Sequence, residues 1–215
     1  GVTLLLLETV MRVLDITQDM TTGQFCDAVI KPNTLKRRFT FLDLLTGDEG
    51  APLMGDALLT KPLFFISHWW GYPVRVLLAM IREHENERAA AGEPPAGYFF
   101  DMFVLNQHQL TKNCTSDADK RRQLVDGLRF SLQACGTLLL CCMTGPTGAP
   151  GWKSPAPFAR VWCLFEVFVA ITEEVKVVVR LASKDMTEFR MAVLKEGDEV
   201  VDTALAVLDA RDATA

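Results

Sequence analysis

The chain lacks the sequence features that mark several easily recognised classes of protein. It contains no C-x-x-C pair, and its three histidines, His68, His84 and His108, are too scattered to form a zinc site. It also has no G-x-G-x-x-G or Walker-type glycine loop, which argues against Rossmann oxidoreductases and P-loop NTPases. We therefore expect no bound metal and no resident nucleotide cofactor.

Surplus basic charge and long apolar runs are also missing. The 215 residues carry a formal net charge of -5, which argues against binding to nucleic acid or to an anionic membrane surface. The apolar run Leu4–Leu7 is far too short for a signal-peptide core or a membrane span. Most of the six cysteines lie inside apolar segments, where a free thiol behaves as a small hydrophobe, and this favours a reducing, cytoplasmic location.

From Pro62 onward, short apolar runs alternate with helical patterns, which is typical of a parallel sheet joined by crossover helices. The predicted strands cover residues 63–67, 98–105, 137–143 and 175–181, and no clear fifth strand follows. The predicted helices cover residues 74–88, 118–134, 158–171, 185–195 and 198–210. We predict an α/β fold, a flavodoxin-like three-layer sandwich with a central parallel sheet of four to five strands in the order 2-1-3-4.

The remaining segments suggest how the chain is organised. Residues 1–61 contain helical patterns at 4–13 and around 24–30, and we expect them to form a mostly helical extension packed on the main α/β domain of residues 62–215. After the third predicted strand comes a connection rich in Gly and Pro, residues 144–156. It is longer than the ~4 to 6 residues usual in such folds, so we expect a binding loop or a mobile one.

Glu166 is the only carboxylate in the apolar segment 158–171, where Arg160 is the only other charged residue. Taking a carboxylate out of water is costly unless it has a partner, shifts its pKa or serves a cleft. Arg160 is six positions away and lies on a different part of the predicted helix, so it is a poor local partner. Glu166 is therefore the first candidate for a functional residue, although its carboxylate could instead cap a loop amide.

The position of a binding pocket follows from the predicted sheet. Ligands of open parallel sheets bind beyond the carboxyl ends of the strands, at the switch between strands one and three. Here those ends are residues 67–71 and 143–145. Trp69 or Trp70 could offer an aromatic face, and Ser67 and His68 could bind ribose or phosphate. Beyond these lie Asp101, Asn106 and Gln107, in or after the second predicted strand.

Each of these candidates also has a structural interpretation. Trp69, Trp70 and Trp162 could be core or interface aromatics. Asp101 interrupts an apolar run, so it should either face a strand-end pocket or pair with a buried donor. Arg160 could hold a phosphate or an acidic side chain, or it could be solvated at the first helical turn.

Three segments in order, FFISHWWG (64–71), YFFDMFVLNQHQ (98–109) and ARVWCLFEV (159–167), resemble the Toll/interleukin-1 receptor (TIR) superfamily. The third is the most specific, because Trp162, Cys163 and Glu166 fall in the register of the family's W-C-x-x-E stretch. The WWG, FFDMFVLNQ and RVWCLFE stretches are also similar to the heterokaryon-incompatibility domain. The missing fifth strand and the Trp69-Trp70 pair depart from typical TIR sequences.

The resemblance implies a signalling or defence domain that cleaves NAD at the nicotinamide-ribose bond, with Glu166 as the catalytic residue. Candidate substrate-binding residues are Ser67, His68, Trp69, Trp70, Asp101, Asn106, Arg160 and Trp162. The resemblance further implies self-association, or association with other TIR-like domains, to complete the site. The alternative is a catalytically silent interaction module of a larger signalling protein.

Overall fold

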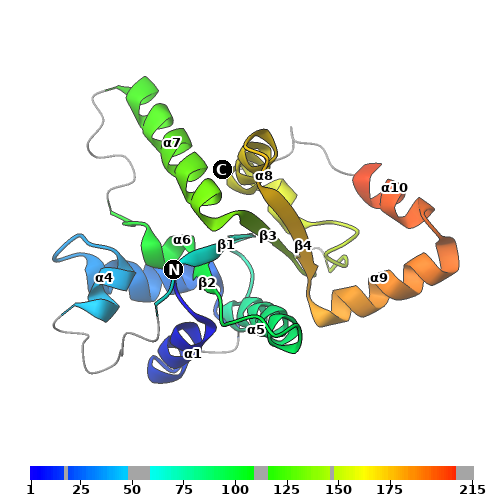
Figure 1. The fold of residues 1–215 in the computed structure, drawn as a ribbon, viewed down its shortest axis with the longest axis horizontal. Coiled ribbons are helices and arrows are strands. Elements are labelled where there is room, and N and C mark those ends of the chain that lie inside the picture. The colour runs from blue at the N-terminus through cyan, green and yellow to red at the C-terminus, as the bar shows by residue number, and fades with distance from the viewer. Residues whose placement is uncertain (17–18, 48–58, 109–115, 146–147, 207–215) are drawn as a thin grey trace.

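The computed structural model describes residues 1–16, 19–47, 59–108, 116–145 and 148–206. Four parallel strands, β1 (Pro62–His68), β2 (Gly97–Phe99), β3 (Thr137–Cys142) and β4 (Lys176–Leu181), form one sheet in the order β2-β1-β3-β4 (Figure 1). This confirms the predicted parallel sheet and its order, and the arrangement is that of a flavodoxin-like fold.

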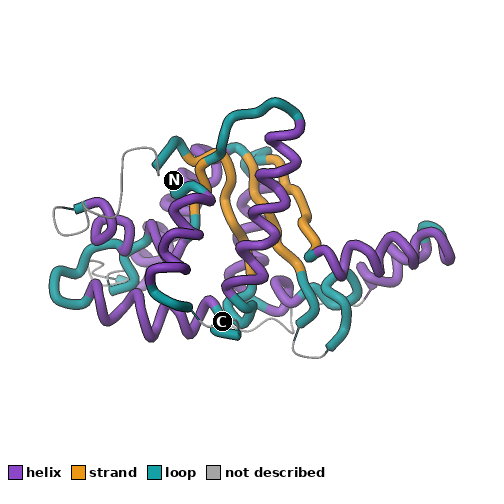
Figure 2. Tube along the Cα trace, turned by 90° about the horizontal axis from the view of Figure 1, so that it is seen from below, coloured by secondary structure: helices purple, strands orange, loops and turns teal. Residues whose placement is uncertain are grey.

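Helices cover both faces of the sheet, because its central strands bury successive residues on opposite sides. Ile66 and Leu139 belong to one apolar cluster, with residues of α1 (Leu4–Val13) and α5 (Val74–Ala90). Phe65 and Leu138 belong to a second cluster, with residues of α7 (Asp117–Cys135) and α8 (Val161–Thr172). Figure 1 shows α5 and the α7–α8 pair on opposite sides of the strands, and Figure 2 shows the sheet from below.

Further helices follow strands β3 and β4 along the chain. A single 3-10 turn, η4 (Ala156–Ala159), precedes α8, and β4 leads into α9 (Ser183–Glu196) and α10 (Glu199–Ala206), which extend away from the sheet (Figures 1 and 2). The last four residues of the predicted helix 198–210 lie outside the described residues. None of the described helices is both long and apolar enough to span a lipid bilayer.

One predicted element is wrong. Residues 98–105 do not form a single strand, because β2 ends at Phe99 and α6 (Asp101–Val104) follows. Phe100, Met102 and Phe103 are all fully buried, as an apolar run predicts, although they do not lie in a strand. A short continuous apolar run has no period that distinguishes a strand from a buried helical turn. Here the helical turn α6 forms, and its Phe103 packs against residues that precede β1.

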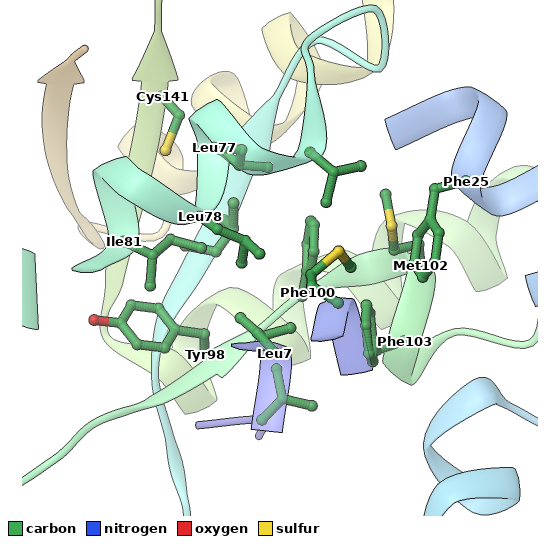
Figure 3. Packing of buried hydrophobic residues seen from close by; sticks show 14 of the residues in the cluster. Leu7, Phe25, Leu77, Leu78, Ile81, Tyr98, Phe100, Met102, Phe103 and Cys141 are labelled. Atoms are coloured by element: carbon green, nitrogen blue, oxygen red, sulfur yellow. The ribbon is translucent and has the colours of Figure 1, made fainter. Parts of the chain in front are cut away.

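Residues before β1 pack on the same core as the sheet. They form α1, the consecutive helical turns α2 (Thr22–Phe25), η1 (Cys26–Ile30) and α3 (Lys31–Thr34), and α4 (Phe41–Thr46). Val2 exchanges two backbone hydrogen bonds with Tyr98, of 2.9 and 2.8 Å. Phe25 and Phe41 pack against Phe103, with ring centroids 6.2 and 5.1 Å away. Figure 3 shows Leu7 of α1 beside Tyr98, Phe100 and residues of α5 in this cluster.

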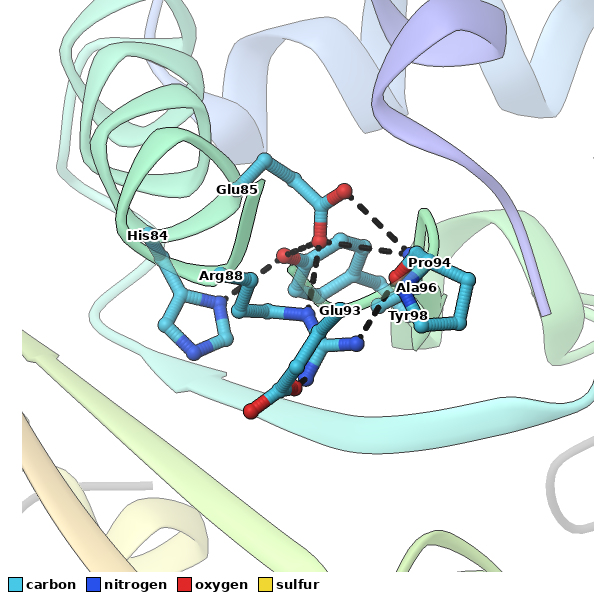
Figure 4. Close-up of polar contacts among 7 residues, drawn as sticks. All are labelled: His84, Glu85, Arg88, Glu93, Pro94, Ala96 and Tyr98. Atoms are coloured by element: carbon cyan, nitrogen blue, oxygen red, sulfur yellow. Dashed lines mark hydrogen bonds and ion pairs between the residues drawn. The ribbon is translucent and has the colours of Figure 1, made fainter. Parts of the chain in front are cut away.

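A polar cluster ties the end of α5 to the start of β2 (Figure 4). The Tyr98 hydroxyl donates to Glu85 Oε1 at 2.7 Å, and its oxygen lies 2.9 Å from His84 Nδ1. Glu85 also accepts the Ala96 N–H and pairs with Arg88. Burial raises the pKa of Tyr98 and keeps its hydroxyl protonated. Ala96 directly precedes β2, and Tyr98 pairs with Phe64 near the start of β1, so this cluster lies at the amino ends of the strands, opposite to their carboxyl ends.

Candidate functional site

The end of β1 and the first half of α8 meet at the carboxyl edge of the sheet. Cys163 and Glu166 are three positions apart on α8 and so point to the same side of the helix. The Ser67 hydroxyl donates to Glu166 Oε2 at 2.6 Å, and Cys163 Sγ donates to the His68 carbonyl at 3.2 Å. These two contacts place the Glu166 carboxyl group beside the last residues of β1.

The electrostatic surroundings of Glu166 favour the protonated acid. Burial raises its pKa to about 8, and nearby Asp101 acts in the same direction. The hydrogen bond from Ser67 and the charge of Arg160 oppose this shift but do not cancel it. At neutral pH this half-buried carboxyl group is therefore largely neutral, and a cation bound beside it would favour ionisation.

Trp70, Asp101 and Arg160 form the outer part of the same cluster. The Trp70 indole N–H donates to Asp101 Oδ2 at 3.3 Å, and the Arg160 guanidinium carbon lies 4.7 Å from the centroid of the Trp70 ring. Asp101 Oδ1 also accepts the Met102 N–H at 2.7 Å, and burial raises the pKa of Asp101. Of the two interpretations of Asp101, the contact with Trp70 supplies the buried donor.

His68 and Ser67 are almost completely buried beneath the surface of this site, at 2% and 1% exposed. His68 Nε2 is 3.2 Å from the Thr22 hydroxyl, which donates to the Trp70 carbonyl at 2.9 Å. Burial lowers the pKa of His68 to about 3, so its imidazole is neutral. In this arrangement both side chains contact protein groups rather than solvent.

Trp69 and Trp162 make no hydrogen bond or ring contact with Glu166 among the described residues; Trp162, four positions before Glu166 on α8, lies on the same side of that helix. Trp69 packs edge-to-face on Tyr72, with centroids 5.5 Å apart, and folds over Gly71, where an added Cβ would lie 2.2 Å from the indole. Trp162 is 41% exposed and contacts Phe165 on the outer surface of α8. The structure thus gives these two tryptophans packing or surface positions.

Asn106 and Gln107 follow α6 and make local contacts. The Asn106 side chain donates to the Arg38 carbonyl and accepts the His108 N–H at 2.9 Å. Gln107 donates to the carbonyls of Asp101 and Leu105. Among the hydrogen bonds of the described residues, none joins Asn106 to Glu166 or Ser67.

The Gly- and Pro-rich connection is held at its base by Asp185, which the sequence did not single out. Asp185 is 2% exposed and accepts three hydrogen bonds: from the Thr144 N–H at 2.9 Å, the Thr144 hydroxyl at 2.8 Å and the Gly151 N–H at 2.8 Å. Gly151 is required because a Cβ there would lie 2.6 Å from the Met143 backbone. The only sequence signal was an acidic residue in the first turn of α9. Residues 146–147 of this connection lie outside the described part.

A surface hollow of about 370 Å³ lies elsewhere, between α1 and α5, and none of its lining residues belongs to the Glu166 cluster. No group of three or more His, Cys, Asp or Glu residues suited to a metal ion occurs within the ranges that the structure describes.

Comparisons with protein-family models, with curated proteins and with solved structures find no match to this chain. The fold and this site define an α/β protein of the flavodoxin-like type, with a half-buried carboxyl group at the carboxyl edge of its sheet.

Proposed function

We propose that this chain is a TIR-like signalling or defence domain that cleaves NAD at the nicotinamide-ribose bond, with Glu166 as the catalytic carboxylate. The observation that carries the proposal is the position of this group. It is half-buried beside the end of β1, next to β3, where open parallel sheets bind their ligands. A strongly shifted pKa at such a position is typical of functional carboxyl groups.

The chemistry needs only one carboxylate. The bond between ribose C1′ and the nicotinamide nitrogen breaks, and its electron pair goes to the nitrogen, which leaves neutral. The ribosyl centre becomes cationic, and the Glu166 carboxylate stabilises or captures it before a nucleophile such as water adds. Because the nicotinamide ring is cationic before cleavage, its binding lowers the pKa of Glu166 toward the ionised form that the reaction requires.

The other residues of the cluster have separate roles in this proposal. Arg160 binds the diphosphate, since a guanidinium matches phosphate oxygens, and Trp70 offers a ring face once Arg160 moves toward that anion. Ser67 is a positioning residue, because its hydrogen bond fixes Glu166 from the buried side. Self-association, or a second TIR-like domain, completes the site. The protein acts in the cytoplasm, where its buried free thiols stay reduced.

The test is nicotinamide release from NAD by concentrated purified protein. We expect Glu166→Gln to lower the rate at least about a hundredfold, because the replacement cannot ionise. Glu174→Gln, at an exposed position directly after the same helix, should keep the rate of the wild type. Thermal melts must show that both variants are folded. No release by the wild type, even with crowding agents that promote assembly, would contradict the proposal, as would an active Glu166→Gln.

A second candidate, a non-catalytic interaction module, is favoured by the exposed apolar side chains of α8. Four of its apolar side chains are 41% to 66% exposed, namely Val161, Trp162, Phe168 and Ile171. Exposed apolar residues gathered on one helix mark a surface for protein contacts. This candidate predicts self-association that Phe168→Ser weakens and Glu166→Gln leaves unchanged, measured by sedimentation, with no nicotinamide release from either protein.

A further inference from the structure

The hollow between α1 and α5 contains an unusual concentration of arginines. Arg12 comes from α1, and Arg75 and Arg82 come from α5, which packs against α1 (Figure 1). Two acidic residues, Glu8 and Asp15, share the lining. The hollow therefore has one more positive than negative side chain, in a protein whose net charge is -5.

The contacts of the arginines leave most of this positive charge without a counter-ion. Arg75 donates through Nε and Nη2 to the Ile16 carbonyl, at 2.9 and 2.6 Å, which fixes the guanidinium without neutralising it. Arg82 Nε pairs with Glu8 Oε1 at 2.7 Å, and its two Nη groups have no partner among the described residues. Arg12 has no carboxylate partner in the same described ranges.

Two features adapt the hollow to an organic molecule. Its volume of about 370 Å³ falls within the range of small-molecule sites. Its lining includes the apolar side chains of Met11 and Leu78, which are 5% exposed and belong to the core cluster. An arginine held in place by two hydrogen bonds also loses little side-chain entropy when it binds an anion.

We propose that this hollow binds the phosphate group of a small molecule. Arg75 and Arg12 contact its oxygens, Arg82 contributes its free Nη groups, and Met11 and Leu78 contact the part that carries the phosphate. A guanidinium fork matches phosphate oxygens in pairs. The guanidinium groups of Arg12 and Arg75, which have no carboxylate partner among the described residues, outweigh the repulsion from Asp15. The site does not depend on Glu166, which lies on the α8 side of the sheet.

The test uses inorganic phosphate, AMP and adenosine as probes, with the full chain and at constant ionic strength. Calorimetry should show binding of phosphate and AMP but not of adenosine. A tighter constant for AMP identifies a phosphorylated organic molecule, and equal constants identify free phosphate. Arg12→Gln and Arg75→Gln should each weaken binding at least about tenfold, because each removes charge-assisted hydrogen bonds.

Matched variants separate this site from general charge effects. Arg121→Gln removes an exposed arginine of α7 and should leave binding unchanged, as should Glu166→Gln. Arg12 is exposed on α1, so its variant should fold even if Arg75→Gln does not. Unaltered phosphate binding in Arg12→Gln would overturn the proposal, as would phosphate binding no stronger than that of chloride. Binding of an acidic peptide with no response to phosphate would also overturn it.

Discussion

At the scale of single residues, Glu166 and His68 lie at one site but have pKa values shifted in opposite directions. Burial raises the pKa of Glu166 from 4.5 to about 8 and lowers that of His68 from 6.5 to about 3. In both cases burial disfavours the charged form, so one acid and one base are both neutral near pH 7. Because both groups are neutral, they can pack beside an apolar core without placing a charge there.

This shift predicts how Glu166 affects stability at different pH. Because its pKa is higher in the folded than in the unfolded chain, the folded state binds the proton more tightly. The stabilisation is complete below about pH 4.5 and is lost as the pH rises through about 8. Relative to Glu166→Gln, the free energy of unfolding of the wild type should fall by about 1 to 3 kcal/mol between about pH 6 and about pH 9, given ~1.4 kcal/mol per pKa unit and partial exposure of the residue.

Denaturant titrations of both proteins at the two pH values measure this difference. His68 titrates in both proteins and therefore cancels. Glu174→Gln, at an exposed position, should follow the wild type at both values. A constant difference between wild type and Glu166→Gln across this pH range would show that the pKa of Glu166 is not raised.

The sequence around Glu166 marks it as a candidate, whereas the sequence around Asp185 does not. Glu166 was conspicuous because its sequence neighbours are apolar. Asp185 lies among polar residues at the start of α9, and it is buried where Thr144 and Gly151 donate hydrogen bonds to it. No local pattern encodes a contact between residues 34 to 41 positions apart.

At the level of secondary-structure elements, the hydrogen bonds of Asp185 should stabilise the connection between β3 and α8. Asp185→Asn removes the charge and at least one of the three accepted hydrogen bonds, so we expect a loss of about 1.5 to 3 kcal/mol in the free energy of unfolding. Limited proteolysis should become faster between residues 144 and 156. Asp198→Asn, at an exposed position near the end of α9, is the control and should change neither quantity. Equal cleavage rates in wild type and Asp185→Asn would show that this carboxylate does not hold the loop.

Most elements were predictable because their signals are local. The strands β1 and β3 contain continuous apolar runs, β4 contains three consecutive valines, and α5 and α7 have long helical patterns. The second predicted strand was wrong after Phe99, since Phe100, Met102 and Phe103 could be buried by a strand or by a helical turn. Packing of Phe103 against Phe25 and Phe41, from residues before β1, accompanies the helical turn.

At the scale of the whole molecule, residues 1–61 and the α/β domain should unfold together. Leu7 is fully buried in the cluster that also contains Tyr98, Phe100 and Ile81. We expect Leu7→Ala to cost about 2 to 5 kcal/mol through lost burial and a residual cavity. All four tryptophans lie after residue 61, so a shift of the fluorescence-detected transition would report the α/β domain.

Leu5→Ala provides the matched control, because Leu5 belongs to the same helix but is 57% exposed. It should leave the tryptophan transition almost unchanged. If Leu7→Ala lowers the helical signal alone and leaves the tryptophan transition in place, residues 1–61 form a separate folding unit.

The amino-acid sequence was sufficient to predict the α/β class, the parallel sheet and its strand order, and its apolar surroundings made Glu166 a candidate. These features depend on local hydrophobic patterns and on general rules of strand connection. Three arrangements became visible only in the folded chain: Ser67 donates to Glu166, Asp185 accepts hydrogen bonds from Thr144 and Gly151, and three arginines of α1 and α5 line one hollow. Those arrangements join residues far apart in the chain, and their energies depend on burial and on distances that no local pattern specifies.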